Sequence, residues 1–114
     1  MNDCLFCKMI AGEIPCDIVY ENESVFAFRD IDPKAPTHIL LIPRKHIRSI
    51  NELGEPEQNL AGELLLTAKI IAKDEGIDES GFRIIFNTNS DGGQTVFHIH
   101  MHILGGRKMA WPPG

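Results

Sequence analysis

Imidazole and apolar side chains alternate strictly near the C-terminus, from His98 to Leu104. Such alternation is typical of a β-strand, because successive side chains on a strand point to opposite faces of the sheet. The pattern predicts a strand over residues 96–104. On that strand His98, His100 and His102 share one face, and the apolar residues between them face the interior. Candidate chemistry is therefore expected on the histidine face.

The remaining apolar runs predict short strands and one long helix. Strands are expected over residues 17–21, 24–29, 37–42 and 82–87. The first two are separated by Asn22 and Glu23, which is the spacing of a β-hairpin. Residues 37–42 are nearly all apolar and read as a buried central strand that Pro43 ends. Residues 4–11 predict a short helical turn, and residues 30–36 and 88–94 predict loops.

The long helix is expected over residues 55–76. Leu60, Leu64, Ala68 and Ile71 recur at helical spacing, and Leu65 and Ala72 widen this apolar stripe. Strands outnumber helices and do not alternate with them. The pattern therefore predicts a single α+β domain over residues 1–114, with one long and one short helix. Its sheet has about five strands, is mainly antiparallel and is covered on one face.

Composition narrows the function classes. The chain has 114 residues, of which 43% are apolar and 24% charged, with a net charge of -5. An acidic balance argues against a partner such as duplex nucleic acid, which calls for a basic patch. No apolar run reaches the roughly 20 residues of a membrane span, and the N-terminus lacks signal-peptide features, so a cytoplasmic location is expected. Three cysteines, Cys4, Cys7 and Cys16, do not suggest a disulfide framework.

Three histidines on one strand could bind a metal or carry out catalysis. Residues two apart on a strand are separated by roughly 6.6 Å and residues four apart by roughly 13 Å. Zinc holds its nitrogen ligands at about 2.0–2.1 Å, so one strand does not supply a three-histidine zinc centre. Nucleophilic or acid–base catalysis remains, with the central His100 best placed to be held by its neighbours. His38 and His46, each considered alone, are as consistent with surface or capping positions as with function.

The segment before the histidines suits a phosphate group. Gly92 and Gly93 allow close approach of the backbone, and Gln94 and Thr95 add an amide and a hydroxyl just before the predicted strand. Exposed backbone N–H groups with such side chains form anion-binding concavities. The loop therefore complements the histidine face.

Residues 93–104 resemble the His-φ-His-φ-His-φ-φ motif of the histidine triad (HIT) family, where φ is apolar. Residues 6–15, 27–31 and 35–43 resemble further family segments. Residues 105–107 and the ending Trp-Pro-Pro-Gly resemble its Hint (histidine triad nucleotide-binding) branch. The resemblance spans essentially the whole chain. It implies a homodimer whose two sheets join into one, with Trp111 near the partner's site.

The resemblance implies a purine nucleoside phosphoramidase. In this family the middle histidine attacks the α-phosphorus of a nucleoside 5′-phosphoramidate and expels an amine, and water then releases AMP or GMP from the nucleotidyl-histidine. No cofactor is needed for this reaction. Two alternatives stay open, a nucleotide-binding interaction module with vestigial chemistry and a dinucleoside polyphosphate hydrolase. The choice between adenine and guanine also stays open.

Family roles carry over to matching positions. His100 is the implied nucleophile, His98 and His102 flank it, and His38 joins their hydrogen-bonded cluster. Thr95 stands where the branch usually has Ser, which keeps the hydroxyl and adds a methyl group. Asp30 would bind the ribose hydroxyls. The full set of implied nucleotide contacts is Phe6, Met9, Phe28, Asp30, Ile31, Asn87, Gly93, Gln94, Thr95, Val96, His100, His102 and Trp111.

A cysteine pair raises the question of a metal. Cys4 and Cys7 have the spacing of half a metal site, which alone is weak support. Some bacterial family members and the related uridylyltransferases hold a structural zinc through this pair and two histidines. Those histidines match His46 and His98. Two thiolates and two imidazoles form a closed tetrahedral zinc site, so the resemblance implies a structural zinc here.

Overall fold

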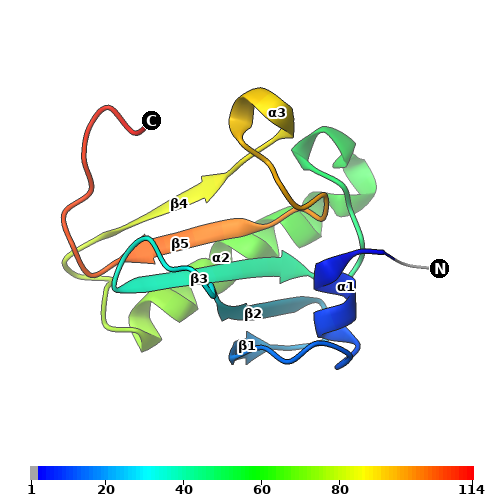
Figure 1. Cartoon of the computed structure of the whole chain (residues 1–114), viewed down its shortest axis with the longest axis horizontal. Coiled ribbons are helices and arrows are strands. Elements are labelled where there is room, and N and C mark those ends of the chain that lie inside the picture. The colour runs from blue at the N-terminus through cyan, green and yellow to red at the C-terminus, as the bar shows by residue number, and fades with distance from the viewer. Residues whose placement is uncertain (1–2) are drawn as a thin grey trace.

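Five antiparallel strands form one sheet in the order β1-β2-β3-β5-β4, in a computed structural model that describes residues 3–114 (Figure 1). The strands are β1 (Ile18–Glu21), β2 (Val25–Arg29), β3 (Thr37–Pro43), β4 (Phe82–Phe86) and β5 (Met101–Gly105). The helices are α1 (Leu5–Ile10), α2 (Gln58–Asp74) and the one-turn α3 (Asn89–Gly92), with short 3₁₀ turns at Ile50–Glu52 and Glu55–Glu57. The predicted α+β class and antiparallel sheet are confirmed.

The first hairpin is closed by the asparagine that the sequence placed in its turn. Asn22 Oδ1 accepts hydrogen bonds from the backbone N–H groups of Ser24 and Val25, at 2.8 and 2.9 Å. The side chain thus supplies the acceptor that these two N–H groups lack in the turn, as asparagine often does. β1 and β2 then pair antiparallel.

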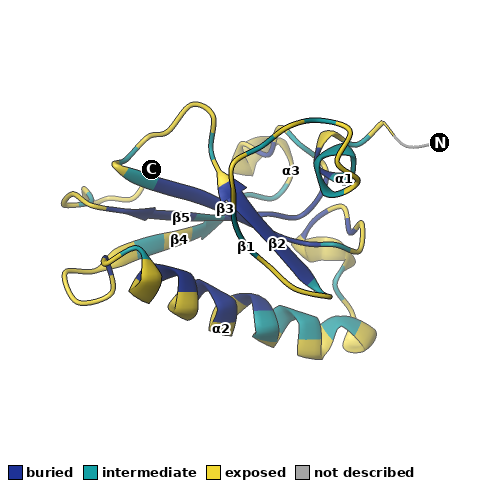
Figure 2. Cartoon of the chain, turned by 90° about the horizontal axis from the view of Figure 1, so that it is seen from below, coloured by how far each residue is buried: buried dark blue, intermediate teal, exposed yellow. Residues whose placement is uncertain are grey.

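The two faces of the sheet are covered differently. Figure 2 shows α2 running along one face, while α1 lies on the opposite side. Side chains on β3 alternate accordingly: Ile39 and Leu41 pack in the core beneath α2, whereas Leu40 and Ile42 pack with Phe6 of α1. The α1 face therefore combines a small apolar cluster with room for a site.

The long helix buries a narrower stripe than expected. Leu64, Ala68, Ile71 and Ala72 are buried against the sheet, as predicted. The expectation for Leu65 is wrong, because its side chain is 54% exposed. One residue beyond Leu64 is about 100° further round a helix, which takes the side chain off the buried face. Among the described residues, no helix is long and apolar enough to cross a membrane.

The histidine segment is less regular than its alternation suggested. β5 begins only at Met101, so the prediction of a strand from residue 96 is wrong, as is the plain loop over residues 88–94, where α3 forms. Ile99 N–H donates instead to Ile47 O at 2.6 Å. The backbone before Met101 therefore pairs with the loop after β3, not with the sheet. His98 therefore lies outside β5 and groups with Cys4, Cys7 and His46.

Candidate active site

A cavity of about 790 Å³ opens on the α1 face of the sheet. Its volume lies in the range of small-molecule sites, roughly 300–1,000 Å³. Two histidines, His100 and His102, form its polar end together with Asp30. The lining residues are Leu5, Phe6, Met9, Ile14, Pro15, Cys16, Asp17, Phe28, Arg29, Asp30, Ile31, Leu40, Thr95, Val96, His100 and His102.

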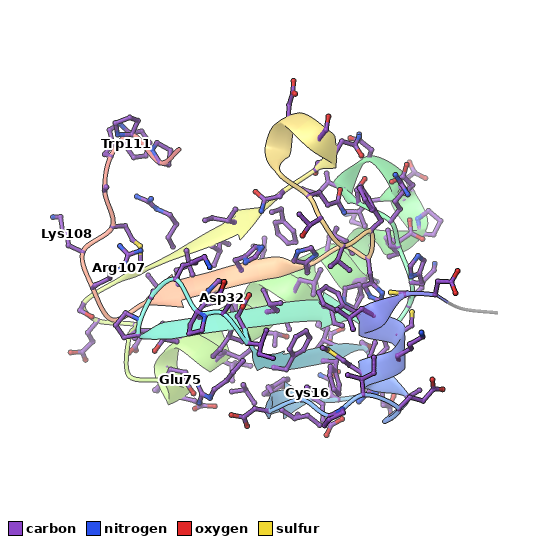
Figure 3. The ribbon with its side chains drawn as sticks, in the orientation of Figure 1. Cys16, Asp32, Glu75, Arg107, Lys108 and Trp111 are labelled. Carbon is purple, nitrogen blue, oxygen red and sulfur yellow. The ribbon has the colours of Figure 1, made fainter. Side chains whose placement is uncertain are left out.

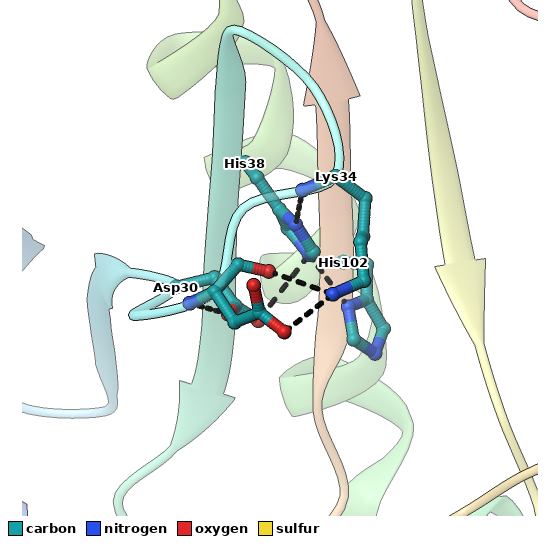
Figure 4. Close-up of polar contacts among 5 residues, drawn as sticks. Asp30, Lys34, His38 and His102 are labelled. Carbon is teal, nitrogen blue, oxygen red and sulfur yellow. Dashed lines mark hydrogen bonds and ion pairs between the residues drawn. The ribbon is translucent and has the colours of Figure 1, made fainter.

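Strand register brings His38 and His102 together. His102 on β5 lies opposite Leu40 on β3, and His38 is two residues before Leu40, so the two histidines are diagonal neighbours on one face. His38 Nε2 and His102 Nδ1 are 2.9 Å apart (Figure 4). Lys34 N–H donates to His38 Nδ1 at 3.0 Å. The proton of neutral His38 is therefore on Nε2, which donates to His102 Nδ1, and His102 in turn carries its proton on Nε2.

Asp30 completes this cluster at the end of β2. Its Oδ1 accepts from Asp32 N–H at 2.8 Å, which fixes the carboxylate, and its Oδ2 lies 3.4 Å from His38 Nε2. Burial lowers the pKa of His38, although the charge of Asp30 opposes this shift. Burial, with the nearby His100 and His38, lowers the pKa of His102 to about 4. Both imidazoles are therefore neutral near pH 7.

A hydrogen bond to the backbone of His98 fixes the ring of His100. Its Nδ1 lies 2.8 Å from the carbonyl oxygen of His98, and because a carbonyl only accepts, Nδ1 carries the proton. Nε2 consequently keeps its lone pair. The ring packs edge-on against Phe6, with centroids 5.1 Å apart, and beside His102 at 5.0 Å. Burial lowers the pKa of His100, so the neutral, nucleophilic form prevails near pH 7.

His98 belongs to a second cluster, with two thiols and His46. His98 Nδ1 lies 3.3 Å from Cys4 Sγ and 3.5 Å from Cys7 Sγ, and His46 Nδ1 lies 3.4 Å from Cys7 Sγ. All four ligand atoms lie within 4.8 Å of one another. Tetrahedral bonds of about 2.0–2.3 Å separate such ligands by roughly 3.3–3.8 Å, so the spacing suits zinc.

The hydrogen bonding of His98 also fits a metal ligand. Its Nε2 lies 2.8 Å from the carbonyl oxygen of Pro43, so Nε2–H donates and Nδ1 presents its lone pair to the sulfurs. Burial raises the pKa of the Cys4 thiol, which favours its neutral form unless a cation lies beside it. A divalent ion would supply that charge. In the part of the chain that the structure describes, no cysteine is in a disulfide.

Not every predicted site residue reaches the cavity. The buried side chain of Gln94 is used internally: Nε2 donates to Arg48 O and Val96 O, at 2.8 and 3.1 Å, and Oε1 accepts from Asn89 N–H. It shapes the loop and does not present its amide to a ligand. His98, Asn87, Gly93 and Trp111 are likewise outside the lining, and Trp111 is 81% exposed at the C-terminal end (Figure 3).

Two backbone groups that organise the histidines had no recognisable sequence signal. These are the N–H of Lys34 and the carbonyl of Pro43. The nearest hint for the first is the pair Pro33 and Pro36, which stiffens the loop around Lys34. The cavity also gains walls from apolar residues outside the predicted set of contacts, among them Leu5 and Leu40.

The fold and site define a class of protein: a small antiparallel-sheet domain with buried neutral histidines at the end of a ligand-sized cavity. Residues 11–109 match the HIT domain family, and the chain belongs to this family. The resemblance noted in the sequence is thereby confirmed.

Relatives with solved structures and assigned names support this placement. A crystal structure of a HIT family hydrolase from Legionella pneumophila superposes with a TM-score of 0.96 at 54% identity, covering 98% of this chain and all (100%) of that one. The purine nucleoside phosphoramidase of Escherichia coli K12 is 51% identical over 105 residues, 92% of this chain and 88% of that protein. A 14 kDa zinc-binding protein of Brassica juncea is 51% identical over 114 residues, 98% of this chain and 100% of that one.

Proposed function

We propose that the chain is a purine nucleoside phosphoramidase that works through a nucleotidyl-histidine. One observation carries the proposal: Nδ1–H of His100 donates a hydrogen bond to the His98 carbonyl oxygen, at 2.8 Å, which leaves the lone pair on Nε2 of a residue that lines the cavity. A neutral imidazole with a fixed tautomer is a ready nucleophile. The E. coli relative, named for this activity, supports the same choice.

The reaction follows from the proton positions. His100 Nε2 attacks the α-phosphorus, forming an N–P bond, and the P–N bond to the amine breaks. The departing amine needs a proton, for which the Thr95 hydroxyl and His102 Nε2–H are the donors that line the cavity. Water then attacks the phosphorus and returns a proton to the group that protonated the amine, while the His100–phosphorus bond breaks and the nucleoside monophosphate leaves. His102 Nε2–H also faces the charge that develops on the phosphoryl oxygens.

The rest of the cavity suits a purine nucleoside. Phe6 and Phe28 are buried, with ring centroids 5.4 Å apart, and Met9 and Ile31 extend this apolar wall. Apolar walls hold a base without distinguishing adenine from guanine strongly. Asp30 lines the same cavity, with its carboxylate 3.4 Å from His38 Nε2, and ribose hydroxyls would donate to it there. Val96 and Thr95 close the phosphate end.

Substitution of the nucleophile tests the proposal. We expect His100→Ala to lower kcat on adenosine 5′-phosphoramidate by about 10³-fold or more, because no other group replaces Nε2. AMP binding, measured by calorimetry, serves as the control and should change little. Turnover in the variant equal to the wild type contradicts the proposal. A wild type that binds AMP without turnover is an interaction module, and faster turnover of a diadenosine polyphosphate than of the phosphoramidate indicates a polyphosphate hydrolase.

A structural zinc is the second part of the proposal. Cys4, Cys7, His46 and His98 would hold it, on the distances and tautomer described above. The ion would join α1 to the loop after β3 and to the segment that carries the His98 carbonyl. The Brassica juncea relative is named as a zinc-binding protein, which supports this assignment. The ion takes no part in the proposed reaction.

We also propose that two copies pair along β4. This strand forms one edge of the sheet, and Phe82 and Ile84 on it are exposed, as are Leu65, Leu66 and Ile70 on the outer side of α2. An apolar, unpaired edge strand is a template for strand pairing. Light scattering should give twice the mass of one chain, and Leu66→Glu should shift the population toward monomer. A wild-type monomer at millimolar concentration contradicts the pairing.

A further inference from the structure

Arg107 joins the C-terminal segment to the loop between β2 and β3. Its Nη2 donates to the carbonyl oxygen of Lys34 at 2.9 Å, and its Nη1 donates to Lys108 O at 3.1 Å. Figure 3 labels Arg107 in the C-terminal segment, between β5 and Trp111. The guanidinium is exposed and permanently charged, so it forms this bridge at any ordinary pH.

Close backbone packing reinforces this bridge. Gly106, just before Arg107, has a φ of +93°, and a Cβ at this position would lie 2.8 Å from Pro36 Cβ. Only glycine combines that backbone conformation with such an approach. The start of the C-terminal segment is therefore fixed against the loop, and the guanidinium meets Lys34 from a defined direction.

Lys34 is held at both of its backbone polar groups. Its carbonyl accepts from Arg107, and its N–H donates to His38 Nδ1 at 3.0 Å. Its side chain makes a separate ion pair, with Nζ 2.6 Å from the carboxylate of Asp32. Movement of this one residue would therefore break the hydrogen bond that sets the tautomer of His38.

We propose that Arg107 is a positioning residue, which holds the Lys34 amide against His38 and thereby keeps the proton of His102 on the nitrogen that faces substrate. The catalytic consequence rests on the proposed function; the tautomers do not. Without the Lys34 N–H, His38 Nδ1 can carry the proton itself. His38 Nε2 then accepts from His102 Nδ1–H, and His102 turns a lone pair, not an N–H, toward the phosphoryl oxygens.

The effect should be partial, because a second group favours the same tautomer. Asp30 Oδ2 lies 3.4 Å from His38 Nε2 and attracts a proton there. We expect Arg107→Ala to lower kcat about 10-fold, well below the 10²–10⁴-fold range that a whole acid–base group contributes. KM should stay within about 2-fold, since Arg107 does not line the cavity. Arg107→Lys, which keeps a charged donor, should recover part of the loss.

Lys108→Ala is the matched control. It removes the same charge from the next position of the same segment, and Lys108 enters the bridge only through its carbonyl. Its kcat should equal that of the wild type. Long-range ¹⁵N–¹H spectra of protein labelled in histidine should show His38 and His102 protonated on Nε2 in the wild type and in Lys108→Ala, and a mixture of tautomers at His38 in Arg107→Ala.

Three results would overturn the inference: Nδ1–H at His38 in the wild type, unchanged tautomers in Arg107→Ala, or an unchanged kcat in that variant. If Arg107→Ala does not keep the circular dichroism of the wild type, Arg107→Lys is compared with Lys108→Ala instead, and tautomers and kcat equal to those of Lys108→Ala then overturn the inference. Exchange broadening or a second tautomer of His38 in Arg107→Lys, with a matching loss of kcat, supports the inference. A wild type without phosphoramidate turnover contradicts the proposed function alone, because the tautomer spectra still decide whether Arg107 acts on His38.

Discussion

Among the described residues, two clusters combine side-chain types that could hold a metal ion, and their backbone surroundings differ. Asp30, His38 and His102 form one, and Cys4, Cys7, His46 and His98 form the other; in each, the ligand atoms lie within 4.8 Å of one another. Residue type and spacing alone would make both clusters candidate metal sites. The hydrogen-bond partners of the imidazoles separate them.

In the first cluster a backbone N–H from Lys34 donates to His38 Nδ1, so the nitrogen inside the cluster carries a proton and has no lone pair for a metal. In the second, the backbone carbonyl of Pro43 accepts from His98 Nε2, so the nitrogen inside the cluster offers its lone pair to an ion. In the proposed function, a donor behind the ring suits a proton relay, whereas an acceptor behind the ring suits a metal ligand. One backbone group thus decides the chemistry of each cluster.

Of the changes that separate the two clusters, breaking the relay is expected to have the largest effect. His102→Ala removes the N–H that faces the phosphoryl oxygens, and we expect kcat on adenosine 5′-phosphoramidate to fall by about 10²-fold or more. Steady-state kinetics measure this. Zinc content, determined on protein prepared without a histidine tag, should equal that of the wild type. Loss of zinc together with kcat would show that the two clusters are not separate.

The reciprocal change should act on the metal. His46→Ala takes one ligand from the second cluster and leaves the relay intact, so we expect zinc below about 0.2 per chain and a Tm lower by about 5 °C or more. The value of kcat at a temperature where the variant is folded should fall less than about 5-fold. Wild-type protein that carries no zinc, or a variant that retains it, would contradict the proposal that the second cluster binds zinc.

Most of the fold followed from the hydrophobic pattern, and its failures have a physical cause. The hairpin at Asn22, the apolar strand β3 and the helix α2 depend on local periodicity and turn chemistry, which a sequence states directly. The alternation at residues 98–104 looked like one strand. Only its second half pairs with β3, because Ile99 N–H is drawn to Ile47 O instead. Hydrophobic periodicity does not reveal which distant segment of the backbone a strand will pair with.

The sequence indicated residues that meet at the site, but not which ring nitrogen of each histidine carries the proton. The family resemblance pointed to His38, His100 and His102, and the structure brings all three into one ring cluster. It did not indicate that the side chain of Gln94 would be occupied by the backbone of Asn89 and of the distant Arg48. Backbone donors such as Lys34 N–H carry no residue signature, because every residue except proline has one.

A smaller effect concerns stability and pH. Burial holds the pKa of His102 near 4, below its ordinary value of 6.5, so between these values the unfolded chain binds more protons than the folded one. Stability contributed by neutral His102 is therefore complete above about pH 6.5 and is lost as the pH falls toward 4. His38 shifts in the same direction. Protonation of these two histidines in mild acid should therefore lower the free energy of unfolding.

His102→Ala separates this contribution from the titration of other groups. The Tm of the wild type should fall more between about pH 7 and about pH 5 than that of the variant, by about 1–3 °C, because the variant has lost one group that resists protonation when folded. The difference is small since His102 is partly exposed to solvent, which screens its charge. Thermal unfolding followed by circular dichroism measures it. An equal or larger fall in the variant would mean that His102 is not kept neutral by the fold, and the relay as described would lose its buried, neutral character.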